Sequence, residues 1–116
     1  VANAVLLPVI TEYNALADHG RYLKIYNYVS RIPASADTFV PEMLTEAFRA
    51  LNQEIGIPAN LTEAVNRAGS DGKITAEEIE KKIPAMAEDA MKSGNIAVNP
   101  RASRQQDIEM LYKRAL

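Results

Sequence analysis

The first fourteen positions contain few polar residues, and within residues 1–10 only Asn3 and Pro8 interrupt an apolar run. On a helix, apolar side chains cover most of the circumference: Ala2, Leu6, Val9 and Tyr13 on one face, with Val1, Val5 and Leu7 beside them. A helix that is apolar nearly all round has to be buried. The pattern therefore predicts a central helix over residues 1–14, kinked at Pro8. A strand over residues 5–10 is disfavoured, because proline cannot donate to a sheet ladder.

This helix is unusual for the end of a chain, because terminal segments usually fray. It also begins at Val1 with neither a methionine nor a capping residue in front of it. We therefore expect that further sequence precedes Val1 in the parent polypeptide.

Two more helices are expected in the first half of the chain. After the linker 15–20, residues 21–31 form an apolar face at helical spacing, made by Tyr22, Ile25, Tyr26 and Val29. Pro33 then ends that helix. The next helix should run from Thr38 or Val40 to Ile55, with an apolar stripe of Leu44, Ala47, Phe48, Leu51 and Ile55. Gly56 suits a left-handed cap after it.

Capping residues mark helix starts in the second half. Asn60, with Glu63 three positions later, opens a short helix whose inward side chains are Leu61, Ala64 and Val65. Thr75 with Glu78 forms a second capping box after a turn at 69–72.

The helix that follows Thr75 should break or kink near Ile83, because Pro84 comes next. Residues 95–102 are expected to be extended or looped. Ser103 with Gln106 resembles a third capping box, before a helix that buries Ile108, Leu111, Tyr112 and Ala115. These patterns predict an all-α multi-helix bundle of about six helical pieces, forming a single domain over residues 1–116.

The composition limits the class of protein to which the chain can belong but does not identify a function. The 116 residues are 47% hydrophobic and 24% charged, with a formal net charge of -2. Such a charge gives no basic footprint for nucleic acid. The apolar start is too short to span a membrane, and it lacks the basic segment and cleavage site of a secretory signal. Without cysteine there is neither a disulfide framework nor a thiolate metal site, which fits a reducing compartment.

Residues 66–78 partly match a calcium-binding loop. With Gly72 as the loop glycine, Asp71 supplies one acidic ligand. However, Arg67 occupies the first ligand position, where a carboxylate is needed, and Gly69 occupies the third. A tight turn before a capped helix is the better interpretation.

Other isolated features have simple structural explanations. The only histidine, His19, lies in a polar linker and is expected at the surface rather than on a metal. The sequon at residues 60–62 coincides with a helix cap. The acidic group Glu77, Glu78 and Glu80 favours a helix start and does not form a catalytic pair.

Two motifs resemble the iron-containing alcohol dehydrogenase family. Residues 1–8 are similar to the segment that follows the last metal-binding His-Gly of that family, and Glu12 and Asn14 continue the likeness. Its C-terminal signature is matched by Asn99-Pro100-Arg101, Asp107-Ile108 and Leu111-Tyr112. The resemblance covers the whole chain, but only about the last third of a family member.

The resemblance implies an iron-dependent, NAD(P)-dependent parent enzyme of the cytoplasm, which passes hydride between a primary alcohol and the nicotinamide. Iron would act as a Lewis acid, held by one aspartate and three histidines upstream of Val1. The chain itself would then contain neither metal ligands nor catalytic residues, and would lack the dinucleotide-binding domain. Alone it should be inactive and bind neither iron nor NAD(P). Its partners would be the missing N-terminal part, a small alcohol or aldehyde, and further copies in a homo-oligomer.

The loop 94–101 is the best candidate for function, because in the family it faces the cleft between the two domains. Some relatives have a cysteine near the nicotinamide at the position of Asn95. We therefore give Asn95 and Ile96 a role in lining the cleft, with a purely structural role as an equal alternative. For Asn99 and Arg101 we favour structural roles, since asparagine before proline starts turns and arginine can satisfy carbonyls at helix ends.

A different class of function also stays open: a self-contained helical interaction module. The uncapped apolar start argues against it, because a finished domain rarely leaves such a helix at its end. If the helices that precede it are missing, an apolar patch should be exposed and cause self-association. A cooperative monomer would favour the module.

Overall fold

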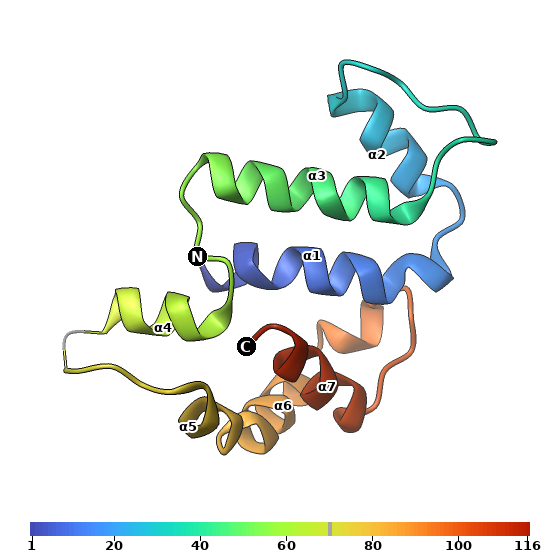
Figure 1. Ribbon diagram of the computed structural model, residues 1–116. Helices are drawn as coiled ribbons and strands as arrows, with labels where there is room; N and C mark the ends of the chain where they lie inside the picture. The colour runs from blue at the N-terminus through green and yellow to red at the C-terminus, as the bar shows by residue number, and fades with distance from the viewer. Residues whose placement is uncertain (70) are drawn as a thin grey trace.

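The computed structural model describes residues 1–69 and 71–116 (Figure 1). Within these residues the chain forms α-helices and two 3₁₀ turns, η1 and η2, and no strand, which confirms the all-α prediction. The elements in order are α1 Ala2–Asn14, η1 Ala15–Ala17, α2 Arg21–Val29, α3 Pro41–Glu54, α4 Leu61–Ala68, α5 Ala76–Glu80, α6 Ile83–Lys92, η2 Ile96–Val98 and α7 Gln105–Arg114.

Helix α1 is the central element. It packs against α3 on one side and against α4 and α7 on the other (Figure 1). It continues through Pro8, and its buried residues are Val5, Pro8, Thr11 and Tyr13. The expectation of burial nearly all round is wrong, since Leu7 is 43% exposed and Ala2 and Ile10 are also exposed. The neighbouring helices of this chain cover only part of the circumference of α1.

Two apolar clusters hold the helices together. The first joins the N-terminal half of α1 to α4 and the chain end, through Val5, Leu61, Ala64 and Ala115. The second joins the C-terminal end of α1 to α6 and α7, through Tyr13, Ala87, Ile108 and Leu111. Val9 and Tyr112 pack against both clusters, so the core is continuous along α1.

Helix α2 is less buried than its pattern predicts. It ends at Val29, two residues before the expected Arg31, and none of its side chains is buried. Ile25 and Val29 of the predicted apolar face are exposed. The reason is that α2 packs mainly on α3, and the Tyr26 ring contacts Phe39, in the segment just before α3, with centroids 5.6 Å apart. The apolar stripe of α3 is likewise buried only in part: Leu44 is 1% exposed, whereas Leu51 and Ile55 are exposed.

Most of the predicted helix ends are confirmed. Gly56 has a φ of 76°, and it closes α3 in a Schellman motif with bonds from Gly56 N to Gln53 O and from Ile57 N to Asn52 O. The Asn60 side chain accepts a hydrogen bond of 2.8 Å from Glu63 N. Inward packing after this cap is confirmed for Leu61 and Ala64, but Val65 is 37% exposed and was wrongly predicted to point inward.

The last two predicted helix starts have different outcomes. Thr75 and Glu78 form the expected reciprocal box, and the helix breaks between α5 and α6 with Pro84 in the first turn of α6. The capping box predicted at Ser103 does not form. Instead α7 begins one residue later, and Asp107 accepts a 2.8 Å bond from the backbone N–H of Arg104.

Candidate functional site

The loop 94–101 connects α6 to α7 and passes beside the C-terminal end of α1 (Figure 1). Gly94 starts it with a φ of 76°, and η2 forms one short turn within it. Asn95 is exposed at the start of this turn. Ile96 is partly buried against the apolar cluster that contains Tyr13. The two predicted cleft residues therefore have different surroundings, one open to solvent and one packed on the core.

An amide pair joins this loop to α1. Asn14 donates through Nδ2 to Asn99 Oδ1 at 2.8 Å, and Asn99 donates back to Asn14 Oδ1 at 2.9 Å. Asn99 Nδ2 also donates to the backbone carbonyl of Arg101 at 2.7 Å. Both amides are partly buried, so the pair fixes the loop against the last turn of α1.

Arg101 makes the second attachment. Its Nη1 donates to the backbone carbonyl of Tyr13 at 2.8 Å, and its guanidinium carbon lies 4.0 Å from the centre of the Tyr13 ring. The predicted role of Arg101 in satisfying a carbonyl at a helix end is thereby confirmed. The Tyr13 ring is 4% exposed, and its hydroxyl lies 3.0 Å from Ser103 Oγ. Ser103, misassigned as a helix cap, instead donates to the Arg101 carbonyl and contacts Tyr13.

We call Tyr13, Asn14, Asn99, Arg101 and Ser103 the loop clamp. The sequence singled out Asn99 and Arg101 but missed Tyr13, Asn14 and Ser103 as their partners. These contacts join positions 85 to 90 residues apart, and no local spacing reveals such a pairing.

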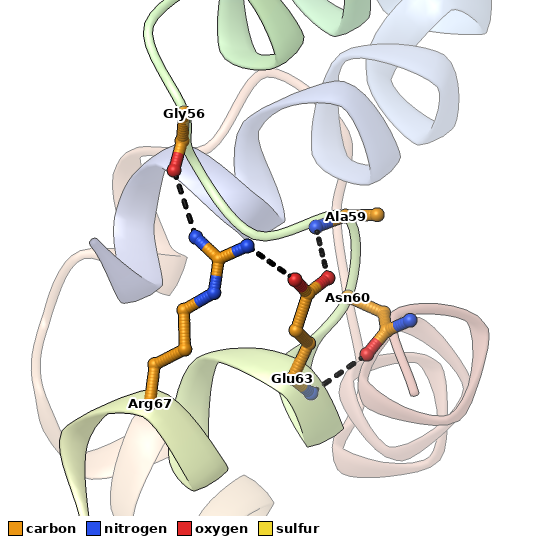
Figure 2. A network of polar contacts seen from close by, with 5 residues as sticks. All are labelled: Gly56, Ala59, Asn60, Glu63 and Arg67. Atoms are coloured by element: carbon orange, nitrogen blue, oxygen red, sulfur yellow. Dashed lines mark hydrogen bonds and ion pairs between the residues drawn. The ribbon is translucent and has the colours of Figure 1, made fainter.

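A second polar network, which shares no residue with the loop clamp, lies at the start of α4 (Figure 2). Arg67 donates to the carbonyl of Gly56 at 2.9 Å and forms an ion pair with Glu63. Glu63 in turn accepts a 3.1 Å bond from Ala59 N. This backbone donor, followed by the Arg67 charge, lowers the pKa of the Glu63 carboxyl below its ordinary value. The network fastens the connection 56–60 to α4, and the sequon asparagine, Asn60, serves as the helix cap.

A cavity of about 520 Å³ opens beside this network, between α1, α3, α4 and the end of α7. Its lining residues include the apolar Val5 and Pro8 and three arginines, Arg49, Arg67 and Arg114. Arg49 lies 2.5 Å from a Glu46 carboxylate oxygen and 3.5 Å from one of Glu12, and Arg67 is paired with Glu63. Two of the three positive charges are thus compensated. Neither Asn95 nor Ile96 lines this cavity.

The described residues do not fit an iron site. Within residues 1–69 and 71–116, no group of three or more histidine, cysteine, aspartate or glutamate side chains is placed to hold a metal ion. His19 is exposed between η1 and α2.

The partial calcium-loop match has a different structural basis. Asn66 bonds both the N–H and the carbonyl of Ile74, at 2.7 and 2.9 Å, and Glu78 accepts from Thr75 N at 2.8 Å. These contacts tie Asn66 of α4 to the backbone just before α5, and Glu78 serves in the helix cap. Ser70, within the predicted turn 69–72, lies outside the described residues.

No helix in the described part of the chain combines the length and the apolar character needed to cross a bilayer.

Comparison with known proteins gives consistent matches over the entire chain. The family model described as "Fe-containing alcohol dehydrogenase family, C-terminal" matches residues 1–116. The chain is 30% identical to 1,3-propanediol dehydrogenase of Citrobacter freundii over 116 residues, covering 99% of this chain and 27% of that protein. Lactaldehyde reductase of Escherichia coli (strain K12) matches with the same identity and coverage. An alcohol dehydrogenase of Thermococcus barophilus is 30% identical over 113 residues, covering 97% of this chain and 26% of that protein.

The chain spans about a quarter of the length of these relatives. The matched portion is in each case nearly the whole of this chain, and the family model is specific to the C-terminal part. The chain therefore belongs to the Fe-containing alcohol dehydrogenase family and corresponds to its C-terminal, helical region.

Proposed function

We propose that residues 1–116 are the C-terminal helical domain of an iron-dependent, NAD(P)-dependent dehydrogenase that interconverts small primary alcohols and aldehydes. The match of the family model over all 116 residues carries this proposal. Relatives named as a 1,3-propanediol dehydrogenase and a lactaldehyde reductase support short, oxygen-rich substrates of three carbons.

In this proposal the metal and the dinucleotide are held by the rest of the enzyme. The donor set of the described residues does not fit iron, so we assign no step through the metal to this chain. Its own contribution is structural: it forms one wall of the cleft, with Asn95 and Ile96 facing the substrate or the nicotinamide. The exposure of Asn95 and the packing of Ile96 against the core support a lining whose position is fixed. We also propose a homo-oligomer for the whole enzyme.

The test compares the whole polypeptide encoded by the gene with residues 1–116 alone. Both are assayed for NAD- and NADP-dependent oxidation of short diols and reduction of hydroxyaldehydes. Each assay is repeated after a chelator has removed the metal, and again after iron has been added back. We expect turnover only from the whole polypeptide, lost on chelation and restored by iron. Turnover by residues 1–116 alone, or none by the whole polypeptide under any of these conditions, would refute the proposal.

The interaction module remains the second candidate, because the described surface carries exposed apolar side chains. Tyr28 is 92% exposed, Leu16 is 84% exposed and Ile32 is 80% exposed. Analytical ultracentrifugation of residues 1–116 separates the two ideas. Concentration-dependent association favours a domain lacking its neighbours, whereas a monomer with one cooperative melting transition favours the module.

A further inference from the structure

The loop 94–101 has little apolar burial to hold it in place. Asn95, Ala97 and Val98 are exposed, the last by 80%, so Ile96 is its main apolar anchor. The backbone bonds within η2 are local, from Val98 N to Asn95 O and from Asn99 N to Ile96 O. They shape the turn but do not tie it to another helix. The position of the loop relative to α1 therefore depends on the polar contacts of the loop clamp.

The contacts of the loop clamp constrain the orientation of the loop 94–101 as well as its distance from α1. Arg101 uses one planar group in two ways, as a donor to the Tyr13 carbonyl and as a cation over the Tyr13 ring. Asn14 and Asn99 exchange two nearly equal hydrogen bonds, which requires their amides to face one another. A lysine ammonium would keep the charge of Arg101 but would lack the planar fork.

We infer that Arg101 and Asn99 are positioning residues of the dehydrogenase site, which hold the loop 94–101 on the end of α1 so that Asn95 and Ile96 face the cleft correctly. This inference rests on the proposed function. Displacement of a reactant-lining group by about 1 Å can lower catalysis about 100-fold. Loss of the clamp should therefore reduce activity without removing any group that touches the reacting atoms.

The experiment uses the whole iron-loaded enzyme and the variants Arg101→Ala, Arg101→Lys and Asn99→Ala. Arg31→Ala is the matched control, because Arg31 is an exposed arginine in the loop after α2. Steady-state kinetics give kcat and KM. Hydrogen exchange of peptides covering residues 94–104 reports the loop itself, with peptides from α3 as an internal reference. Added guanidinium tests chemical rescue of Arg101→Ala.

We expect kcat/KM to fall about 10- to 100-fold in Arg101→Ala and Asn99→Ala. Exchange of residues 94–104 should rise at least about tenfold while α3 is unchanged. Arg101→Lys should recover only part of the loss, guanidinium should partly restore Arg101→Ala, and Arg31→Ala should behave as wild type.

Faster loop exchange with wild-type kcat and KM would overturn the positioning role and leave a structural contact. Unchanged loop exchange would show that the clamp does not hold the loop. An inactive wild-type enzyme would refute the proposed function and with it the positioning role, but the exchange data would still decide whether the clamp holds the loop.

Discussion

The amide pair between Asn14 and Asn99 allows a quantitative test of how the loop 94–101 is attached. The perturbations are Asn14→Ala, Asn99→Ala and the double variant. Asn99 donates to both Asn14 Oδ1 and the Arg101 carbonyl, whereas Asn14 bonds only Asn99 among the contacts of its side chain in the described residues. The two single variants should therefore lower the local opening free energy of the loop by different amounts.

The magnitude follows from the number of bonds lost. A partly buried, neutral hydrogen bond contributes about 1 kcal/mol net. Asn14→Ala removes the two bonds of the pair and should lower the local opening free energy of the loop by about 2 kcal/mol. Asn99→Ala removes these and the bond to Arg101, for about 3 kcal/mol. The double variant should also cost about 3 kcal/mol, because the pair can be lost only once.

The assay is native-state hydrogen exchange of residues 95–104, which reports local opening without requiring two-state unfolding of a multidomain enzyme. A cost of about 2 kcal/mol appears as roughly 30-fold faster exchange. Asn3→Ala is the control, because Asn3 is exposed at the other end of α1.

The expected coupling energy between the two sites is about 2 kcal/mol. If the double variant instead costs about 5 kcal/mol, or if the coupling falls below about 0.5 kcal/mol, the amide pair does not fasten the loop. Equal acceleration by Asn3→Ala would show that the effect is global.

Three other predictions concern the scaffold. Glu63→Gln should lower the melting temperature near neutral pH, because the pKa of Glu63 in the folded state is below its ordinary value. The stabilisation by Glu63 is therefore present above its unfolded-state pKa and is lost as the pH falls through its folded-state pKa. The melting temperatures of wild type and variant should converge in acid, and a difference that does not depend on pH would contradict this prediction. In denaturant titrations Leu44→Ala should lower the free energy of unfolding by about 2–5 kcal/mol, because Leu44 is 1% exposed. Leu51→Ala, at a half-exposed position, should lower it by under about 1 kcal/mol, and equal losses would refute the packing argument. Gly56→Ala should cost about 1–2 kcal/mol, because its φ of 76° is unfavourable for a residue with a Cβ, and an unchanged unfolding midpoint would show that this end of α3 relaxes.

The features predicted correctly from the sequence are those whose causes are local. A cap needs only two residues three positions apart, which is why Asn60 with Glu63 and Thr75 with Glu78 were identified. Ser103 with Gln106 fits the same spacing but failed, because the Ser103 hydroxyl is engaged by Tyr13 and Arg101 instead. A contact with a distant segment outweighs the local pattern there.

Apolar periodicity identified the helices but overestimated their burial. The pattern of α2 is amphipathic, yet Ile25 and Val29 are exposed because α2 packs mainly on α3. Similarly, Leu7 of α1 is 43% exposed, because the helices in the described part of the chain do not cover it. Periodicity tells which residues share a face, whereas the number of helices that cover that face depends on the tertiary arrangement.

The arrangement also explains why the loop clamp lies at the end of α1. This helix of 13 residues is about 20 Å long and belongs to both apolar clusters, with Val5 in one and Tyr13 in the other. Because Val9 and Tyr112 contact both clusters, the two ends of α1 are fixed to one continuous core. A loop bound to Tyr13 and Asn14 is therefore placed relative to the whole helix and not merely to its last turn. In the proposed enzyme, α1 would serve as the common reference for the cleft-lining loop and for the part of the enzyme that holds the metal.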